Sequence, residues 1–121
     1  MEKTKSSGKV TFHDKSVYIG EIENELPNGY GVWTHPDGEE YKGQWSDGKE
    51  NGSGVYSYPD GGEFSGNFVN GLREGLGIWS HPDGSKYHGN WSKGQFHGKG
   101  IFIWSDQKKY EGDWRNGVQE G

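Results

Sequence analysis

The sequence contains no cysteine and no alanine, and few of its side chains are aliphatic. Without cysteine there can be no disulfide framework, no thiolate metal site and no thiol catalysis, which fits a reducing compartment. Leu, Ile, Val and Phe together supply only 19 of the 121 residues, a content typical of disordered chains. The 23 glycines make continuous helix improbable, because glycine costs roughly 1 kcal/mol per helical position relative to alanine.

Long hydrophobic runs and blocks of one charge sign are also missing. The longest apolar run, from Ile101 to Trp104, is far too short to span a bilayer, and no apolar segment follows the first lysines, so no secretory signal is predicted. We therefore expect a cytoplasmic chain that meets a membrane, if at all, only at its surface. The net charge of -5 is carried by acidic and basic residues mixed along the chain, which argues against a nucleic-acid partner.

The sequence does contain 18 aromatic residues, and they recur at a fixed interval. The aromatic residue that opens each 23-residue period is found, with no insertion or deletion, at Tyr18, Tyr41, Phe64, Tyr87 and Tyr110. Because Trp and Tyr bury large areas, such rings can replace an aliphatic core. The chain is therefore predicted to be a folded repeat protein without a globular interior.

Each repeat carries two alternating patterns that predict β-strands. The first places an aromatic residue, a glycine and another aromatic residue at Tyr41, Gly43 and Trp45. The second places a glycine and then two aromatic residues at alternate positions of residues 54–58. The segment SDGKENGS is expected to be a loop between the two strands, and the following YPDG or HPDG to turn the chain into the next hairpin. The predicted fold is all-β: an elongated, open-ended, single-layer antiparallel sheet of hairpin repeats with about ten strands.

The expected organisation is a polar N-terminus, residues 1–17, followed by the repeat array, residues 18–121. Residues 1–7 are expected to fray, and residues 9–13 to form a capping strand from half a repeat. The repeats are 18–40, 41–63, 64–86, 87–109 and a partial unit, 110–121, expected to stop before its second strand.

The glycines suggest how the strands pair, because each ring would lie over a bare glycine on the neighbouring strand. The predicted pairs are Gly54 with Trp45, Tyr56 with Gly43, Tyr41 with Tyr58, and Tyr56 with Gly66 of the next repeat.

The pattern Y-x-G-x-W-x-x-G-x-x-x-G-x-G, with an Asp-Gly turn near the end of each 23-residue unit, resembles the MORN repeat (membrane occupation and recognition nexus). The resemblance covers residues 18–121, with departures at Ile22, Glu25, Ser105 and Gln107. It implies an elongated sheet of antiparallel hairpins. It also implies a scaffold that holds protein partners in a groove or self-associates, an accessory array beside an enzymatic domain such as a lipid kinase or lysine methyltransferase, or a module that binds anionic phospholipids.

No residue pattern predicts catalysis, a metal site or a cofactor. The five histidines lack clustered ligand spacing, and the recurring aspartates lie at turns, where Asp bonds its own backbone. Glycine motifs such as GSG are not followed by a helix that could bind an anion. Because nothing unique in the sequence interrupts the repetition as an active site would, we expect a chain that is not an enzyme.

The aromatic strip is the candidate binding surface, and its rings form either a closed core or a groove for a partner peptide or helix. The residues expected to line the groove are Trp33, Tyr56, Tyr58, Phe64, Trp79, Trp91 and Phe102. The strand edges are a second route, because the last strand, residues 110–114, is expected to lack a covering element and to allow strand addition or homo-oligomers.

The alternative partner is a membrane surface with anionic headgroups. The lysines expected to contact it are Lys42, Lys86, Lys93, Lys108 and Lys109. The acidic net charge favours a protein partner, because carboxylates near these lysines offset their attraction to the membrane.

Overall fold

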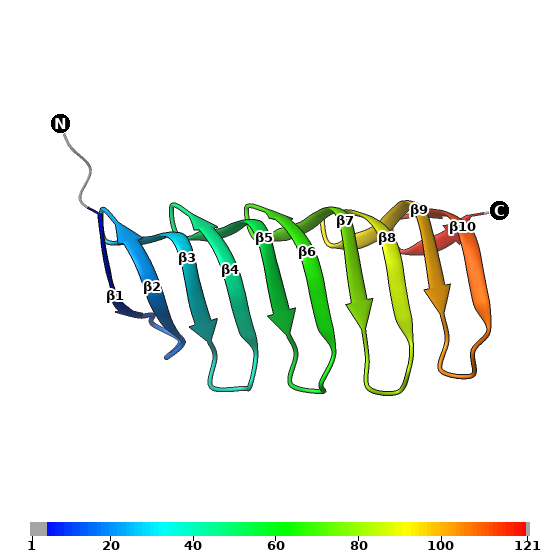
Figure 1. Cartoon of the computed structure of the whole chain (residues 1–121), viewed down its shortest axis with the longest axis horizontal. Coiled ribbons are helices and arrows are strands. Elements are labelled where there is room, and N and C mark those ends of the chain that lie inside the picture. Colours follow the sequence, from blue (N-terminus) through cyan, green and yellow to red (C-terminus); the bar gives the residue numbers. More distant parts are fainter. Residues whose placement is uncertain (1–4, 121) are drawn as a thin grey trace.

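The chain folds into one open antiparallel sheet in which every strand pairs with the next along the sequence (Figure 1). The computed structural model describes residues 5–120. Its strands are Lys5–Thr11 (β1), Val17–Glu23 (β2), Leu26–Thr34 (β3), Glu40–Ser46 (β4), Lys49–Ser57 (β5), Glu63–Val69 (β6), Leu72–Ser80 (β7), Lys86–Ser92 (β8), Gln95–Ile103 (β9), Lys109–Arg115 (β10) and Val118–Glu120 (β11). The predicted all-β, single-layer hairpin fold is confirmed, with 11 strands.

Each hairpin closes on a two-residue turn, and the prediction of a longer loop was wrong. In the second repeat Asp47 and Gly48 both have positive φ, 47° and 86°, the type I′ geometry that matches the twist of paired strands. The segment expected to be a loop therefore continues as strand from Lys49. Gly52, interpreted as a loop residue, instead supplies a positive φ of 103° within β5.

In the first three repeats the other end of the hairpin is the predicted Pro-Asp-Gly turn. In the first repeat the backbone N–H of His35 donates to the Glu39 carbonyl at 2.9 Å, and that of Gly38 donates to the His35 carbonyl at 2.9 Å. The Asp37 carboxylate accepts the backbone N–H of Glu39 at 2.9 Å, so the aspartate stabilises its own turn as expected.

The predicted strand register was wrong by two residues. Gly43 pairs with Gly54 and Tyr41 with Tyr56, and Tyr56 pairs on its other side with Phe64. The short turn, together with a register shift between Gly43 and Trp45, places like residues opposite each other. A row of glycines consequently crosses the sheet at positions 8, 20, 31, 43, 54, 66, 77, 89, 100 and 112.

Rings still lie over glycines, but diagonally and not directly opposite. A Cβ added to Gly54 would come within 2.5 Å of Tyr41 Cε1. The Tyr41 hydroxyl continues past the glycine and donates to the Gln44 carbonyl at 2.9 Å. The predicted reason for glycine, a bare backbone beneath a ring, therefore holds for a different pair of residues.

The core forms where the hairpins bend. At the register shift the ends that carry the two-residue turns fold over from the plane of the long strands (Figure 1). Trp45 is thereby placed edge-on between Tyr18 and Tyr41, with ring centroids 5.1 and 5.4 Å apart. The same contact repeats as a continuous chain of rings, Tyr18, Trp45, Tyr41, Phe68, Phe64, Trp91, Tyr87, Trp114 and Tyr110.

Both ends of the sheet differ from the prediction. The N-terminal strand spans Lys5–Thr11 and not residues 9–13, because the next residues form a turn in which the Phe12 N–H donates to the Ser16 carbonyl at 2.9 Å. Residues 5–7 were expected to fray but pair with β2, while residues 1–4 lie outside the described residues. At the other end the partial repeat has a second strand, because β11 pairs with β10 at residues 113–115.

Candidate binding groove

A row of partly exposed rings lies beside the core on the same face of the sheet. The Trp33 and Tyr56 centroids are 6.1 Å apart, Tyr58 follows Tyr56 at 4.9 Å, and Trp79 stacks on Phe102 at 6.1 Å. These rings are half-buried, whereas those of the core are closed off from solvent. We call this row, Trp33, Tyr56, Tyr58, Trp79 and Phe102, the aromatic groove.

Two residues expected to line the groove lie beneath it. Phe64 is 0% exposed and Trp91 is 4% exposed, and their rings contact each other at 4.9 Å. Both belong to the core, so they form the floor that supports the exposed rings of the groove.

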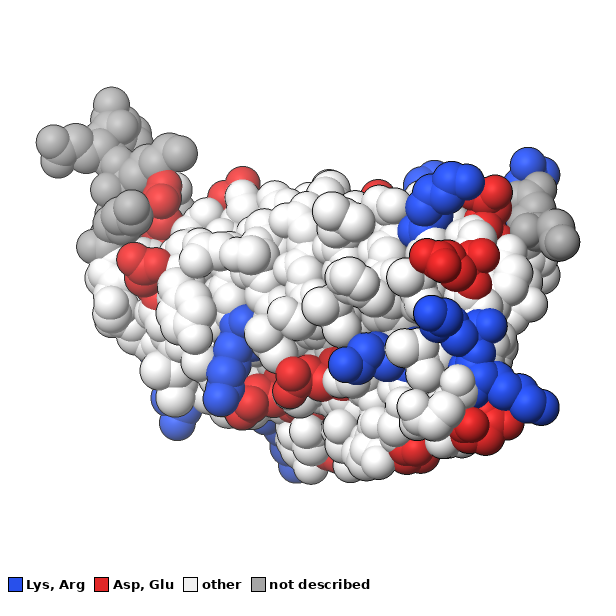
Figure 2. Space-filling model, turned by 45° about the vertical axis from the view of Figure 1, so that its right-hand side comes forward, with Lys and Arg blue, Asp and Glu red and all other residues white. Residues whose placement is uncertain are grey.

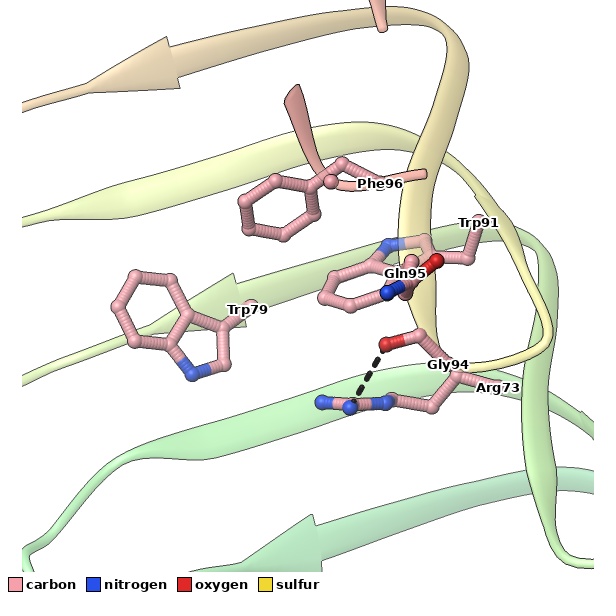
Figure 3. Close-up of a pocket in the computed structure, with 7 residues that line it drawn as sticks. Arg73, Trp79, Trp91, Gly94, Gln95 and Phe96 are labelled. Atoms are coloured by element: carbon pink, nitrogen blue, oxygen red, sulfur yellow. Dashed lines mark hydrogen bonds between the residues drawn. The ribbon is translucent and has the colours of Figure 1, made fainter. Parts of the chain in front are cut away.

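The groove is hollowed on both sides of Arg73. A hollow of about 230 Å³ is lined by Arg73, Trp79, Trp91 and Phe96, and one of about 500 Å³ by Tyr58, Arg73 and Trp79. Figure 3 shows the rings of Trp79 and Phe96 and the guanidinium facing the first of these spaces. The two hollows share Arg73 and Trp79 as lining residues, so they lie next to each other along the groove.

Arg73 is held in a fixed position by three contacts. Its guanidinium donates to the Tyr58 hydroxyl at 3.0 Å and to the Gly94 carbonyl at 2.8 Å, and its Cζ lies 4.7 Å from the centroid of the Trp91 ring (Figure 3). Burial raises the pKa of Tyr58, although the Arg73 charge opposes that shift. A guanidinium has five N–H donors, so Arg73 can also donate to a carboxylate or carbonyl of a bound molecule.

Arg73 belongs to a row that breaks the repeat symmetry. It pairs with Phe68 across its hairpin, and the same place in the other complete repeats is taken by Pro27, Glu50 and Phe96. Sequence reasoning missed this row because it followed only recurring residues. The signal was a place, nine residues after each opening aromatic, where the residue type changes while its flanks repeat. We call these four residues the variable row, and they give each stretch of the groove a different chemistry.

The groove is acidic beside the second repeat. Glu50 lies opposite Trp45, half-buried, and burial raises the pKa of its carboxyl. Burial, followed by a hydrogen bond from the Tyr56 hydroxyl to the Glu39 carboxylate, raises the pKa of Tyr56, and the nearby Glu50 charge adds to that shift. Acidic and basic members of the variable row thus occupy adjacent repeats.

One cluster of potential metal ligands lies at a Pro-Asp-Gly turn. The ligand atoms of His35, Asp37 and Glu39 lie within 4.8 Å of one another. His35 Nδ1 accepts the backbone N–H of Asp37 at 3.1 Å, and the Glu39 carboxylate accepts the Tyr56 hydroxyl. Hydrogen bonds within and beside the turn therefore account for the cluster.

The five lysines considered for lipid binding do not gather in one place. By register, Lys42, Lys86 and Lys109 lie on the face opposite the groove, whereas Lys93 lies in a two-residue turn and Lys108 at the other end of its hairpin. Lys42 and Lys108 each pair with a carboxylate two residues earlier, at 3.5 and 3.8 Å. Figure 2 shows basic and acidic side chains intermingled on the face in view.

A family model of the MORN repeat matches five consecutive segments, residues 18–40, 41–63, 64–86, 87–109 and 110–121. The chain belongs to the MORN-repeat family. MORN repeats are generally protein or membrane interaction modules and are typically non-catalytic. A comparison with curated protein sequences gives no match for this MORN-repeat chain. The described residues include no helix that is long and apolar enough to cross a membrane.

Proposed function

We propose that this MORN-repeat chain is a non-catalytic interaction scaffold that binds a segment of a partner protein along its aromatic groove. The observation that supports the proposal is the depression formed by two adjacent hollows, both lined by Arg73 and Trp79. The core beneath it is already closed, yet Tyr58 and Trp79 are only half-buried. Partly exposed Trp and Tyr beside a fixed Arg is the composition of interface hot spots.

The groove favours recognition through side chains. The backbone groups beneath it are paired with neighbouring strands, so they cannot also bond a partner main chain. The depression crosses several strands, and a bound peptide or helix would therefore lie along the ribbon and contact several repeats. Apolar side chains would fill the hollows, and Arg73 would supply a polar anchor.

The test uses peptides selected against the chain from a random displayed library, with affinities measured by titration calorimetry. Trp79→Ala should lower the affinity for the selected peptides by about tenfold or more, because removing a hot-spot ring usually costs over 1 kcal/mol of binding free energy. Ile78→Ala is the matched control, since Ile78 is the neighbouring residue in β7 but faces the opposite side and is 41% exposed.

Circular dichroism and thermal melts establish that both variants fold. Weaker binding to Trp79→Ala with unchanged binding to Ile78→Ala supports the groove. Selected peptides that lose affinity for Ile78→Ala alone, or a library that yields no binder, would overturn the proposal.

The membrane alternative has less support from the charge distribution. Lys42 and Lys108 each pair with a nearby carboxylate, and the net charge is -5. Flotation with vesicles containing phosphatidylserine separates the two possibilities. If the chain floats with the vesicles at low salt, and the Lys86→Gln/Lys109→Gln variant does not, the result would favour membrane binding. If the chain is absent from the vesicle fraction, the result favours a protein partner.

Self-association through the sheet edges is a second candidate that a specific observation favours. Among the described residues β11 is the last strand of the sheet, and it pairs with residues 113–115 of β10, so its outer edge has no strand beside it. The outer edge of β1 is open in the same way. A molar mass that rises with concentration in sedimentation experiments would indicate end-to-end assembly.

A further inference from the structure

The groove contains a separate hollow of about 270 Å³ near Glu50. Three rings line it, those of Phe12, Trp33 and Trp45, together with the carboxylates of Asp14 and Glu50. The residues come from the β1–β2 turn and from β3, β4 and β5, so the hollow is assembled from consecutive hairpins. Ring faces combined with carboxylates are the chemistry that binds an ammonium group.

Glu50 carries a negative charge in this hollow that no positively charged side chain neutralises among the described residues. Among residues 5–120, no lysine, arginine or histidine forms an ion pair with it. Its carboxyl is nevertheless half-buried, which raises its pKa. A carboxylate withdrawn from water without a cation loses hydration and gains no Coulomb attraction in return. Such an uncompensated charge is typical of a binding site.

The other acidic residue of the hollow is already engaged. Asp14 accepts the Ser16 hydroxyl at 2.5 Å and the Ser16 backbone N–H at 2.9 Å. Asp14 therefore contributes negative charge to the hollow, and Glu50 supplies a carboxylate that has no ion pair among the described residues.

Arg73 provides an internal comparison, because it takes the place of Glu50 in the next hairpin. Its charge is compensated by the Tyr58 hydroxyl, the Gly94 carbonyl and the Trp91 ring. The same position of the repeat thus holds a charge with polar partners in one repeat, Arg73, and a charge without an ion pair in the repeat before it, Glu50.

We infer that the Glu50 hollow binds a lysine side chain of the partner segment that occupies the aromatic groove. The inference rests on the proposed function and names the side chain that is recognised at one end of the groove. The four-carbon stem of lysine packs against ring faces, and its compact ammonium group brings three donors to the carboxylate. The rings of the hollow would contact the lysine stem, and the Glu50 carboxylate would contact its ammonium group.

The lysine belongs to a protein chain because the hollow adjoins the aromatic groove. Trp33 lines the hollow, and its ring lies 6.1 Å from Tyr56, which leads through Tyr58 to Arg73. One repeat is two strands wide, about 10 Å at ~4.8 Å per strand, which about three extended residues span. A short partner segment with its lysine at Glu50 is therefore long enough to reach Arg73. There a carboxylate or carbonyl oxygen of the segment can accept a hydrogen bond from the guanidinium.

The test follows the indole N–H resonances of the chain by NMR during titration with N-acetyl-lysine methylamide. The matched probe is N-acetyl-norleucine methylamide, which keeps the stem and removes the charge. The lysine probe should shift the Trp33 and Trp45 resonances saturably and leave that of Trp79 unchanged. Phe substitutions of Trp33, Trp45 and Trp79 assign the signals.

Glu50→Gln should lower the affinity for the lysine probe by about fivefold or more, because a charged hydrogen-bond acceptor is replaced by a neutral one. Glu63→Gln is the matched control, since Glu63 is an exposed carboxylate whose register places it on the opposite face. Equal shifts with both probes, or equal affinity in wild type and Glu50→Gln, would overturn the inference. Tighter Glu50-dependent binding of phosphocholine than of the lysine probe would assign the hollow to a lipid headgroup and overturn it as well.

The peptides selected for the groove separate the two claims. Peptides that need Trp79 but bind wild type and Glu50→Gln equally would leave the groove function intact and defeat the lysine assignment. Loss of lysine-containing peptides in both Trp79→Ala and Glu50→Gln supports the two together.

Discussion

The ring of Phe64 lies so close to Gly77 that a Cβ at Gly77 would come within 2.5 Å of Phe64 Cε1. Gly77→Ala should therefore lower the free energy of unfolding by about 1–3 kcal/mol, as overpacking does. Gly8→Ala is the control, because Gly8 lies in the same glycine row and its added Cβ meets only Ile22 Cδ1, at 3.2 Å. Urea denaturation measures both, and equal stabilities would contradict the role given to the ring.

The hydroxyl of Tyr87 donates to the Asn90 carbonyl at 2.8 Å, a contact also made by the opening tyrosines of other repeats. Tyr87→Phe keeps the ring and should cost about 1 kcal/mol of unfolding free energy through the lost hydrogen bond. Tyr30→Phe should change stability by only a few tenths of a kcal/mol, because Tyr30 is 50% exposed. A Tyr87→Phe melt that matches wild type would show that the hydrogen bond contributes nothing.

Burial raises the pKa of Tyr18 and of Tyr87 to about 12. Because the folded pKa lies above the unfolded value, the stabilisation is present below about pH 10 and is lost as the pH rises through about 12. Tyrosinate absorbance and the near-ultraviolet circular dichroism of the core should therefore change together in this window. Titration of these tyrosines with the core signal intact would contradict their burial.

Burial also raises the pKa of the Glu50 carboxyl. The protonated form is favoured in the folded chain, so stability is greatest below the unfolded pKa and falls as the pH rises through the folded pKa. Glu50→Gln should therefore melt higher than wild type at pH 7, and the difference should shrink below about pH 4. Melts across this range, with Glu63→Gln as control, measure the effect. A lower melting temperature for Glu50→Gln at pH 7 would show that the carboxylate is stabilised in the fold.

The first hairpin closes on Asn24 and Glu25, with φ of 52° and 66°, where later repeats place glycine second in the turn. A side chain at this φ is strained, so Glu25→Gly should stabilise the chain by about 1 kcal/mol. Glu25→Ala removes the same carboxylate without relieving the backbone, and it separates strain from charge. If both variants raise the melting temperature equally, the stabilisation would come from removing the carboxylate, and the backbone strain at Glu25 would be refuted.

Recurrence in the sequence was enough to predict the hairpins but not the chemistry of the groove. The alternation at Tyr41, Gly43 and Trp45 correctly placed these rings on one face, since successive side chains of a strand point to opposite sides. Arg73 and Glu50 were missed because no partner for them can be recognised until the strands are paired. Tyr58 follows the end of β5 whereas Arg73 lies in β7, and Trp45 lies in β4 whereas Glu50 lies in β5.

By itself, the sequence determined the 23-residue hairpin unit, the Pro-Asp-Gly turns, the family and the face on which the rings lie. Tertiary structure decided the register, the bend, and which rings are closed into the core or left open in the groove. The physical reason is that a period of two residues fixes which side of a sheet a residue takes but leaves the offset between strands free. That offset is set by the geometry of a two-residue turn and the register shift beside Gly43.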